Sequence, residues 1–386
     1  MKIVIAPDSF KESLSALEVA QAIARGIQMV LPDAQIRCIP MADGGEGTLV
    51  AVLDATAGER RTAWVTDALG RPMKAAWGWL PNNTALIEMA SAAGLEHIMP
   101  ADRDPLVADT FGVGTLILAA LDAGARTIVL TAGGSATNDG GTGMLRALGV
   151  RWLNAQDQPL PPGGAELANL AHIDPSALDP RLKSCQLIVA TDVNNPLCGP
   201  TGASAIFGPQ KGATPAMVRQ LDAALDHMAD LSAQVLASDV RHDPGAGAAG
   251  GVGFAAIAWL NAQMRPGAEM VAELVDLERA VEQADLVFTG EGSMDAQTKQ
   301  GKTPMGVMQI AQCHQVPVIA LTGQLGEGYQ TLYEVGLTAA FSLANGPLSL
   351  QQACEQGQTL LQARAADIMR TWLTAATVAT TRRSSG

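Results

Sequence analysis

The sequence predicts an α/β protein in which a doubly wound parallel sheet is interrupted by a large second domain of mixed α/β (α+β) character. Near both ends of the chain, short apolar segments alternate with segments of helical periodicity, which is typical of parallel β-α-β units. The middle of the chain begins with alternating apolar and polar residues, which is typical of antiparallel strands. The 386 residues are enough for two or more domains.

The first β-α-β-α segment lies at the N-terminus. Residues 2–6 (KIVIA) predict a buried strand, and residues 13–30 have apolar residues at helical spacing after a possible N-cap at Ser13 or Ser15. "QIRCIP" predicts a second strand, and "ADGGEGTLVAVLDAT" predicts a glycine turn that opens a helix. The pattern returns late in the chain, where "ADLVFTGEG", "VPVIALTGQ" and "TAAFSLA" predict three more strands separated by helices. Sheets of this kind bind ligands at the carboxyl ends of their strands.

The middle of the chain predicts an insertion. "TAWVTDALGRPMKAAWGWLPNNTALIEMA" has turn residues at "LGRP" and "PNN", which predicts an antiparallel meander. We expect residues 1–58 and 267–376 to form one discontinuous domain, residues 59–266 the inserted domain, and residues 377–386 a disordered tail. The strand at 286–289 should therefore lie in the same sheet as residues 2–6.

Composition excludes several classes of partner. The formal net charge of −13 argues against nucleic acid and against an anionic membrane surface. No apolar run approaches the roughly 20 residues of a membrane span. The five cysteines are odd in number, widely spaced and without a C-x-x-C pair, which predicts free thiols in a reducing cytoplasm. The sequence favours small-molecule partners and does not indicate an oligomeric state.

Two segments resemble nucleotide-binding motifs. "GAGAAG" (Gly245, Gly247, Gly250) matches G-x-G-x-x-G, but "ASDVRHDP" precedes it where a strand is required, which favours a glycine-rich helix start that allows close packing. "AQTKQGKT" (296–303) resembles a P-loop with Ala296 in place of the first glycine. We interpret the second segment as an anion site at a helix terminus at most.

Four glycine-rich segments follow predicted strands: "ADGGEGT" (42–48), "AGGSATNDGG" (132–141), "ATDVNNPLCGPTGA" (190–203) and "TGEGSMDAQTKQGKTP" (289–304). A glycine turn before a helix exposes N–H groups that suit phosphate. Each segment carries an aspartate, which suits Mg²⁺ or a general base. Three of only seven lysines, Lys11, Lys211 and Lys302, lie in segments rich in Gly, Pro or Ser. Together these features predict phosphoryl transfer from ATP.

The strings "APDSFKESLSA", "PMADGGEGT", "GGSATNDGG", "DVNNPLCGPTGASAIFGPQKGA", "PGAGAAGG" and "TGEGSMDAQTKQGKTPMGV" resemble the signature segments of the type I glycerate kinase family. The resemblance runs in order from Ile5 to about Val307. It implies ATP-dependent phosphorylation of D-glycerate at O2 to give 2-phosphoglycerate, with Mg²⁺. It also implies a flavodoxin-like domain, a second α/β domain and an active site in the interdomain cleft.

A glycerate site needs cations or N–H groups for the carboxylate, and a carboxylate that accepts the proton of the reacting hydroxyl. Asp192 is the leading candidate for the base or for a carboxylate beside the metal, and a turn-capping aspartate is the alternative. Asp43 is the rival base, and Lys11 completes the catalytic set. The candidate substrate-binding residues are Asp8, Ser9, Gly44 and Gly45.

The predicted ATP and phosphate residues lie in the later glycine-rich segments: Gly134, Ser135, Thr137, Asn138, Lys211 and Lys302. Asp295 and Glu291 are candidates for Mg²⁺ or for a ribose hydroxyl. The alternatives are a kinase of another small hydroxy acid, a kinase that forms 3-phosphoglycerate, a nicotinamide-dependent oxidoreductase, and a non-enzymatic protein that binds a sugar acid. The sequence does not indicate which loop holds the adenine.

Overall fold

The computed structural model describes residues 1–299 and 301–384, without the side chains of residues 376–384. The chain divides into two compact units. Unit 1 comprises Met1–Asp43, Val50–Thr56 and the chain from Ala268 onward. Unit 2 comprises Gly44–Leu49 and Ala57–Gly267. The chain therefore passes from one unit to the other more than once, and each unit is described separately below.

Unit 1 contains a five-stranded sheet in which every neighbouring pair is parallel, as predicted. The strand order is β15-β13-β11-β1-β2. The strands are β1 (Lys2–Ile5), β2 (Gln35–Cys38), β11 (Leu286–Thr289), β13 (Val318–Thr322) and β15 (Leu337–Ser342). The pairing of Ile3 with Leu286 confirms that the two ends of the chain share this sheet. Counted along unit 1, the order is 2-1-3-4-5, and ligands of such sheets bind where the order reverses, here at β1 and β11.

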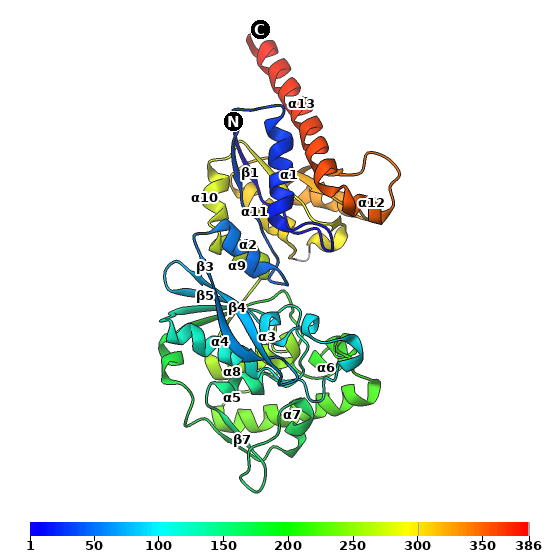
Figure 1. The fold of residues 1–386 in the computed structure, drawn as a ribbon. Helices are drawn as coiled ribbons and strands as arrows, with labels where there is room; N and C mark the ends of the chain where they lie inside the picture. The colour runs from blue at the N-terminus through cyan, green and yellow to red at the C-terminus, as the bar shows by residue number, and fades with distance from the viewer. Residues whose placement is uncertain (300, 385–386) are drawn as a thin grey trace. The chain divides into compact units, whose positions relative to one another are not determined.

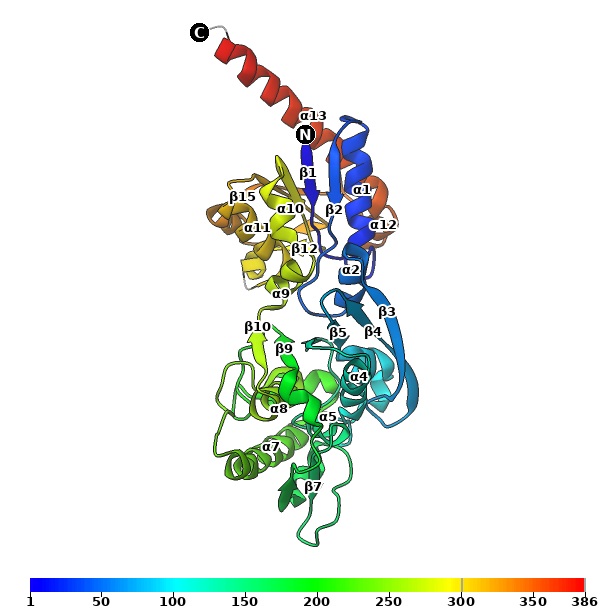
Figure 2. The same cartoon turned by 90° about the vertical axis from the view of Figure 1, so that its left-hand side faces the viewer.

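Helices pack on both faces of this sheet (Figures 1 and 2). Helix α1 (Ala16–Gln28) begins with a capping box in which Ser15 and Glu18 bond each other's main-chain N–H, so Ser15 is the N-cap. Helix α1 packs against α13 (Gly357–Ser384), and the two helices bury Ile3 and Phe288. The remaining helices are α2 (Thr48–Ala55), α9 (Gly267–Leu274), α10 (Leu277–Glu282), α11 (Thr303–Cys313) and α12 (Leu350–Glu355).

Unit 2 contains a six-stranded mixed sheet with the order β10-β9-β6-β5-β4-β3. Strands β3 (Glu59–Thr66), β4 (Pro72–Leu80) and β5 (Thr84–Glu88) form the predicted antiparallel meander. The three other strands run parallel to β5: β6 (Thr127–Thr131), β9 (Gln186–Ala190) and β10 (Gln263–Arg265). Loops that carry several predicted site residues follow β6 and β9 at their carboxyl ends.

The helices of unit 2 bury a second core, which includes Val113, Leu130 and Phe254. Trp152 and Trp259 pack edge to face in it, with ring centroids 5.7 Å apart. The helices are α3 (Ala90–Ala93), α4 (Phe111–Asp122), α5 (Thr142–Ala147), α6 (Ala203–Phe207), α7 (Pro215–Leu236) and α8 (Val252–Leu260). The long helix α7 and the short helix α5 are labelled in Figure 1.

The C-terminal prediction overlaps α13, which has Ser384 as its last residue. The predicted disordered tail, 377–386, thus falls partly on this helix, and residues 385–386 lie outside the described residues. Within the described part of the chain, none of the helices combines the length and apolar character needed to cross a membrane. The five cysteines are free, as predicted.

Candidate active site

The glycine-rich loop at 131–143 connects β6 to α5 and is packed against protein on several sides. Gly140 and Gly141 have φ of +66° and +72°, a conformation that favours glycine. A Cβ atom at Gly133 would lie 2.7 Å from the Cα of Gly45, and one at Gly143 would lie 2.4 Å from Asp109 Oδ1. Left-handed backbone and close packing therefore account for these glycines, and a role in admitting a polyanion to the backbone stays a prediction.

Asp139 fixes the shape of this loop. Its Oδ2 accepts hydrogen bonds from Thr110 N (3.0 Å), Thr110 Oγ1 (2.7 Å) and Gly143 N (3.0 Å), and its Oδ1 accepts one from Gly141 N (3.1 Å). Asn138 Nδ2 donates to Ser204 Oγ (2.9 Å). Both carboxylate oxygens of Asp139 are thus used to hold the start of α5.

Two atoms of the loop remain without a hydrogen-bond partner among the described residues. They are the buried Thr137 Oγ1 and Asn138 Oδ1. A buried polar atom without a partner carries a cost of about 1–3 kcal/mol, so such atoms call for a bound water or ligand. Thr137 and Asn138, two of the predicted ATP-binding residues, therefore each have one polar atom that can form a hydrogen bond with a ligand.

Lys211 supports the same loop from inside unit 2. Its side chain is buried, and its Nζ donates to Ser135 Oγ (2.9 Å) and to the carbonyl oxygen of Thr137 (2.5 Å). Burial lowers the pKa of Lys211 to about 7, although the nearby Asp139 carboxylate favours the charged form. Lys211 is therefore a buried lysine, although it lies in a glycine-flanked loop.

The "GAGAAG" segment packs on the 131–143 loop. Gly250 has φ of +70°, and a Cβ atom there would lie 2.0 Å from the carbonyl oxygen of Thr137. A Cβ atom at Gly251 would lie 2.6 Å from the Cα of Gly140. The segment precedes α8, so the interpretation of these glycines as a helix start that allows close packing is confirmed.

Replacing Gly250 by Ala should destabilise unit 2 by more than the roughly 1–3 kcal/mol cost of a strained backbone conformation, because the added methyl group also meets Thr137. Gly124 offers a matched control, since it has φ of +91° and no atom within 4 Å of its Cβ position. Thermal unfolding of Gly250→Ala and Gly124→Ala should show the larger loss for Gly250→Ala. Equal losses of melting temperature in the two variants would mean that the packing of Gly250 on the 131–143 loop contributes nothing to stability.

Gly44 and Gly45 belong to unit 2, whereas Asp8 and Ser9 belong to unit 1. Gly44 has φ of +86°, and its Cβ position lies 3.1 Å from the Cα of Gly267 and 3.5 Å from the carbonyl oxygen of Ala190. Gly45 lies against Gly133, as described above. The structure thus places Gly44 and Gly45 beside the loops after β6 and β9.

Asp192 is exposed and lies two residues beyond the end of β9. Its Oδ1 accepts a hydrogen bond from Gly267 N (3.1 Å), the first residue of α9. This contact orients the carboxylate and ties the loop after β9 to a segment that is distant in sequence. Asp192 therefore lies near Gly44, because both contact Gly267.

Glu88, the last residue of β5, is a further candidate that no sequence motif marks. Its Oε1 accepts a hydrogen bond from Leu49 N (2.7 Å) in the Gly44–Leu49 segment. Burial, together with the nearby carboxylates of Glu96 and Glu46, raises the pKa of Glu88 to about 7. An acidic residue at the end of the apolar strand "TALIE" was the signal that could have identified it.

We expect Glu88→Gln to remove a pH dependence from stability. The pKa of Glu88 is about 7 in the folded protein and about 4.3 in an unfolded chain, so the folded state binds more protons between these values. Wild-type stability should therefore fall as pH rises from about 4.5 to about 7. Glu88→Gln keeps the oxygen that accepts from Leu49, so its melting temperature relative to that of the wild type should rise as pH increases from about 4.5 to about 7 and stay constant above pH 7. Glu282 is exposed and serves as the control. An equal pH-dependent rise of melting temperature in Glu282→Gln would contradict the assignment of this pH dependence to Glu88.

Unit 1 gathers three acidic residues beyond β1, β2 and β11. Asp8 accepts hydrogen bonds from Thr303 Oγ1 (2.6 Å) and Ser9 N (2.6 Å). Burial and the nearby Asp43, with a smaller effect of Glu291, raise the pKa of Asp8 to about 6. The carboxyl ends of these strands therefore carry concentrated negative charge, at the position where sheets of this order bind ligands.

Lys302 pairs with one carboxylate of this cluster. Its Nζ lies 3.3 Å from Glu291 Oε2, while Glu291 Oε1 accepts from Thr298 Oγ1 (2.6 Å). Lys302 is the N-cap residue of α11, so the predicted anion site at 296–303 does precede a helix. Lys11 is exposed in the loop after β1.

The predicted metal ligands are Glu291 and Asp295. The described residues contain no group of three or more His, Cys, Asp or Glu side chains that could hold a metal ion. Glu291 already pairs with Lys302, and Asp295 Oδ1 accepts from Gln297 N (2.8 Å). Mg²⁺ commonly takes one or two carboxylates and completes its shell with phosphate oxygens and water. Glu291 and Asp295 fit such a site only if a phosphate group supplies further ligands.

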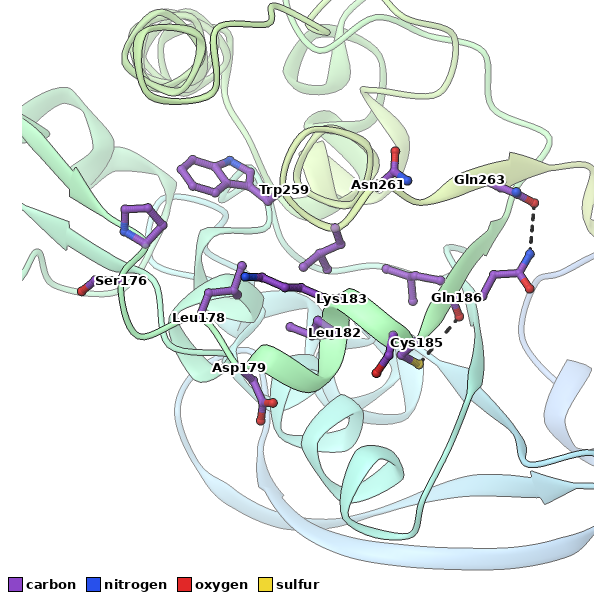
Figure 3. A pocket seen from close by; sticks show the side chains of 14 residues that line it. Ser176, Leu178, Asp179, Leu182, Lys183, Cys185, Gln186, Trp259, Asn261 and Gln263 are labelled. Atoms are coloured by element: carbon purple, nitrogen blue, oxygen red, sulfur yellow. Dashed lines mark hydrogen bonds between the residues drawn. The ribbon is translucent and has the colours of Figure 1, made fainter.

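A cavity of about 770 Å³ in unit 2 does not contain the predicted site residues. It lies by the amino end of β9, beside Cys185 and Gln186, and Figure 3 shows Leu178, Leu182 and Trp259 around it. Because ligands of α/β sheets bind at the carboxyl ends of strands, this cavity is not the candidate active site.

The fold and the site define a class of protein. It is an α/β protein of two compact units that has glycine-rich loops, carboxylates and lysines at the carboxyl ends of its strands. The chain belongs to the glycerate kinase family, whose model matches residues 3–373. The resemblance of the signature segments is thereby confirmed.

Two named relatives and one solved structure are similar along nearly the whole chain. "Glycerate kinase" of Bacillus subtilis (strain 168) is 50% identical over 370 residues, which cover 95% of this chain and 97% of that protein. "Glycerate 2-kinase" of Escherichia coli (strain K12) is 49% identical over 354 residues, which cover 92% and 93%. A crystal structure from Salmonella typhimurium LT2 has 47% sequence identity and a TM-score of 0.88, and the match covers 97% of this chain and 99% of that one.

Proposed function

We propose that this chain transfers the γ-phosphoryl group of ATP to D-glycerate and forms 2-phosphoglycerate and ADP. The supporting observation is the family match over residues 3–373, together with 49% identity to the Escherichia coli protein named glycerate 2-kinase. The strand order of unit 1 supports the flavodoxin-like assignment. The interdomain position of the active site stays a prediction.

In this reaction a hydroxyl oxygen of glycerate forms a bond to the γ-phosphorus, and the bond to the oxygen bridging the β- and γ-phosphorus breaks. The proton of the hydroxyl passes to a carboxylate. We assign this role to Asp192, because it is exposed at the end of a strand and its Oδ1 is oriented by Gly267 N. Asp43 is the alternative base, and its carboxylate lies near Asp8.

The substrates are anions, so the proposal assigns them to N–H groups, hydroxyls and lysines. Glycerate is assigned to Lys11, Asp8, Ser9, Gly44 and Gly45. The ATP phosphates are assigned to Lys302 and to the 131–143 loop, which includes Gly134, Ser135, Thr137 and Asn138. The unpartnered Thr137 Oγ1 and Asn138 Oδ1 support the second assignment. Lys211 acts there by holding Ser135 and Thr137 in place.

Bound Mg²⁺ would neutralise part of the negative charge on the phosphates. Glu291 and Asp295 are the residues assigned to it, with phosphate oxygens completing its shell. The free thiols support the predicted cytoplasmic location.

A coupled assay of ADP release tests the proposal with D-glycerate, L-glycerate, tartronate and hydroxypyruvate as acceptors. We expect turnover to be fastest with D-glycerate and phosphorus NMR to identify 2-phosphoglycerate as the product. Faster turnover of another acid, or a 3-phosphate product, would replace the proposed substrate or position. Binding of D-glycerate without ADP release would favour a non-enzymatic binding protein.

A further inference from the structure

A second cavity, of about 720 Å³, opens in unit 1 and contains only Lys11 among the proposed site residues. Its walls come from the turn at 10–13 after β1, the short strands β12 (Ser293–Met294) and β14 (Gln324–Leu325), the loop at 342–349 after β15, and α12. It lies at the carboxyl ends of the strands, where ligands of such sheets bind. Its volume is within the roughly 300–1,000 Å³ of small-molecule sites.

The walls of this cavity are largely apolar. Phe10 and Leu343 are buried in them, and Leu325 and Leu348 also line the space. Leu350 lines the cavity as well, although its side chain is 79% exposed. Apolar surface that is exposed beside a cavity is surface that a ligand can cover. Glycerate is small and highly polar, so a cavity of this size and lining suits a larger ligand with an apolar face.

Hydrogen bonds between side chains and main chain hold the walls in place. Ser342 Oγ donates to the carbonyl oxygen of Gly323 (3.1 Å) and joins the loops after β13 and β15. Arg364 donates from Nε to Ser342 O (3.1 Å) and from Nη2 to Ala344 O (3.0 Å). Ser13 Oγ donates to Cys354 O (3.1 Å) and joins the turn after β1 to α12. A cavity that is already formed avoids the entropic cost of ordering its walls when a ligand binds.

The cavity adjoins the charged cluster of unit 1 along the chain. Gly292 lines the cavity, and the preceding residue, Glu291, pairs with Lys302 at the start of α11. Lys11 lines the cavity itself and carries a positive charge. An apolar compartment next to cations is the arrangement that a nucleotide requires, because its base is an apolar plane and its phosphates are anionic.

We propose that this cavity binds the adenine and ribose of ATP, with the phosphates directed toward Lys302. The proposal rests on the proposed kinase function and names the part of the chain that holds the nucleoside. Adenine lies between the apolar walls formed by Leu325, Leu343 and Leu348. The hydroxyl group of Ser293, which also lines the cavity, is available to the ribose.

Cys354 provides a direct test because its side chain lines the cavity. The wild-type protein is alkylated with iodoacetamide, and the labelling rate at each cysteine is followed by mass spectrometry. Cys313 is exposed and serves as the internal reference, whereas burial raises the pKa of Cys38 and Cys185 and slows their reaction. Adenosine at ten times its dissociation constant should slow labelling at Cys354 about tenfold and leave Cys313 unchanged.

Three ligands separate the sources of protection. Protection by adenosine supports a nucleoside site. Protection by inorganic tripolyphosphate but not by adenosine would overturn the proposal in favour of a phosphate site. Protection by D-glycerate alone would overturn it in favour of an acceptor site. If none of the three slows labelling at Cys354, the cavity does not bind the nucleoside.

A pair of variants on α12 tests the same site by kinetics. Ala353 lines the cavity, and Gln351 is exposed on the same helix outside it, so Ala353→Trp fills the space while Gln351→Trp adds the same bulk elsewhere. Ala353→Trp should raise KM for ATP about tenfold or more, which is the effect of one misfitting methylene group in an apolar pocket, with KM for D-glycerate little changed. Equal KM values for ATP in the two variants would overturn the proposal.

Failure of this proposal can be told from failure of the proposed function. ADP release from D-glycerate without protection of Cys354 would retain the kinase and reject the cavity as its nucleoside site. Protection by adenosine in a protein that releases no ADP would retain the nucleoside site and reject the kinase. The labelling experiment uses the unmodified chain, so it remains decisive if Ala353→Trp does not fold.

Discussion

Replacing Asp192 by Asn should lower kcat for glycerate phosphorylation about 10²-fold or more, with ATP still bound and the fold intact. The acceptor hydroxyl is a weak nucleophile, and a positioned carboxylate that takes its proton typically contributes about 10²–10⁴-fold. Asn retains an oxygen that can accept from Gly267 N, so the hydrogen bond to the start of α9 survives. The loss of kcat therefore measures the contribution of the carboxylate as a base and as a charge. It does not measure the hydrogen bond from Gly267 N, which the variant keeps.

Asp192→Ala and Asp43→Asn complete this test. Asp192→Ala also removes the acceptor for Gly267 N, so it should lower the melting temperature as well as kcat. If Asp192 is a carboxylate beside the metal, raised Mg²⁺ should recover part of the activity of Asp192→Asn. Near-normal kcat in Asp192→Asn with a collapse in Asp43→Asn would move the base to the segment that begins at Asp43.

Replacing Lys211 by Met should change how stability depends on pH. The pKa of Lys211 is about 7 in the folded protein and about 10.4 in an unfolded chain, so the unfolded state binds more protons between these values. Wild-type stability should therefore rise from about pH 7 to about pH 10 as the burial of a charged lysine ceases to be penalised. The contribution is on the order of 3–5 kcal/mol across this window.

The measurement is the difference in melting temperature between the wild type and Lys211→Met at about pH 6.5 and about pH 9.5. The wild type should gain relative to the variant at the higher pH. The exposed Lys183 provides the control, since Lys183→Met should follow the wild type at both pH values. Equal pH dependence in wild type and Lys211→Met would contradict the burial of an ionisable lysine.

Lys211→Met should also lower kcat/KM for ATP. The substitution removes the donor to Ser135 Oγ and Thr137 O, which leaves two acceptors in the 131–143 loop without their partner. The loop then loses the geometry that the proposal requires for phosphate contacts. Lys302→Ala should also lower kcat/KM for ATP, but it should not alter the pH dependence of stability as Lys211→Met does. Unchanged ATP kinetics in both variants would show that neither lysine serves the nucleotide.

The parallel sheet of unit 1 could be predicted because its signals are local. Each strand is a short apolar run followed by glycine or aspartate, as in residues 2–6 and 286–289, and this pattern identifies a buried strand without knowledge of its neighbours. The meander of unit 2 could be predicted for the same reason, since its alternation has period two. The short strand β10 gave no comparable signal, because "QMR" contains only one apolar residue.

The site was predicted less completely because it depends on segments that are distant in sequence. Nothing local indicates that Gly250 contacts Thr137, or that Lys211 is buried beneath Ser135. The glycine pattern identified turns that follow strands, but the physical use of many of these glycines is contact with other protein segments. Glu88 was missed because it belongs to none of the glycine-rich motifs.

The Gly44–Leu49 segment has a consequence for dissection of the molecule. This segment belongs to unit 2, although the residues on both sides of it belong to unit 1, so unit 2 is not a single stretch of chain. A fragment beginning at Ala57 and ending at Gly267 would lack the partner of Glu88 Oε1 and the backbone that faces Gly133. Cutting the chain before Ala57 and after Gly267 therefore does not give a complete unit 2. A stand-alone version would need the Gly44–Leu49 segment to be joined to it again, for example by circular permutation.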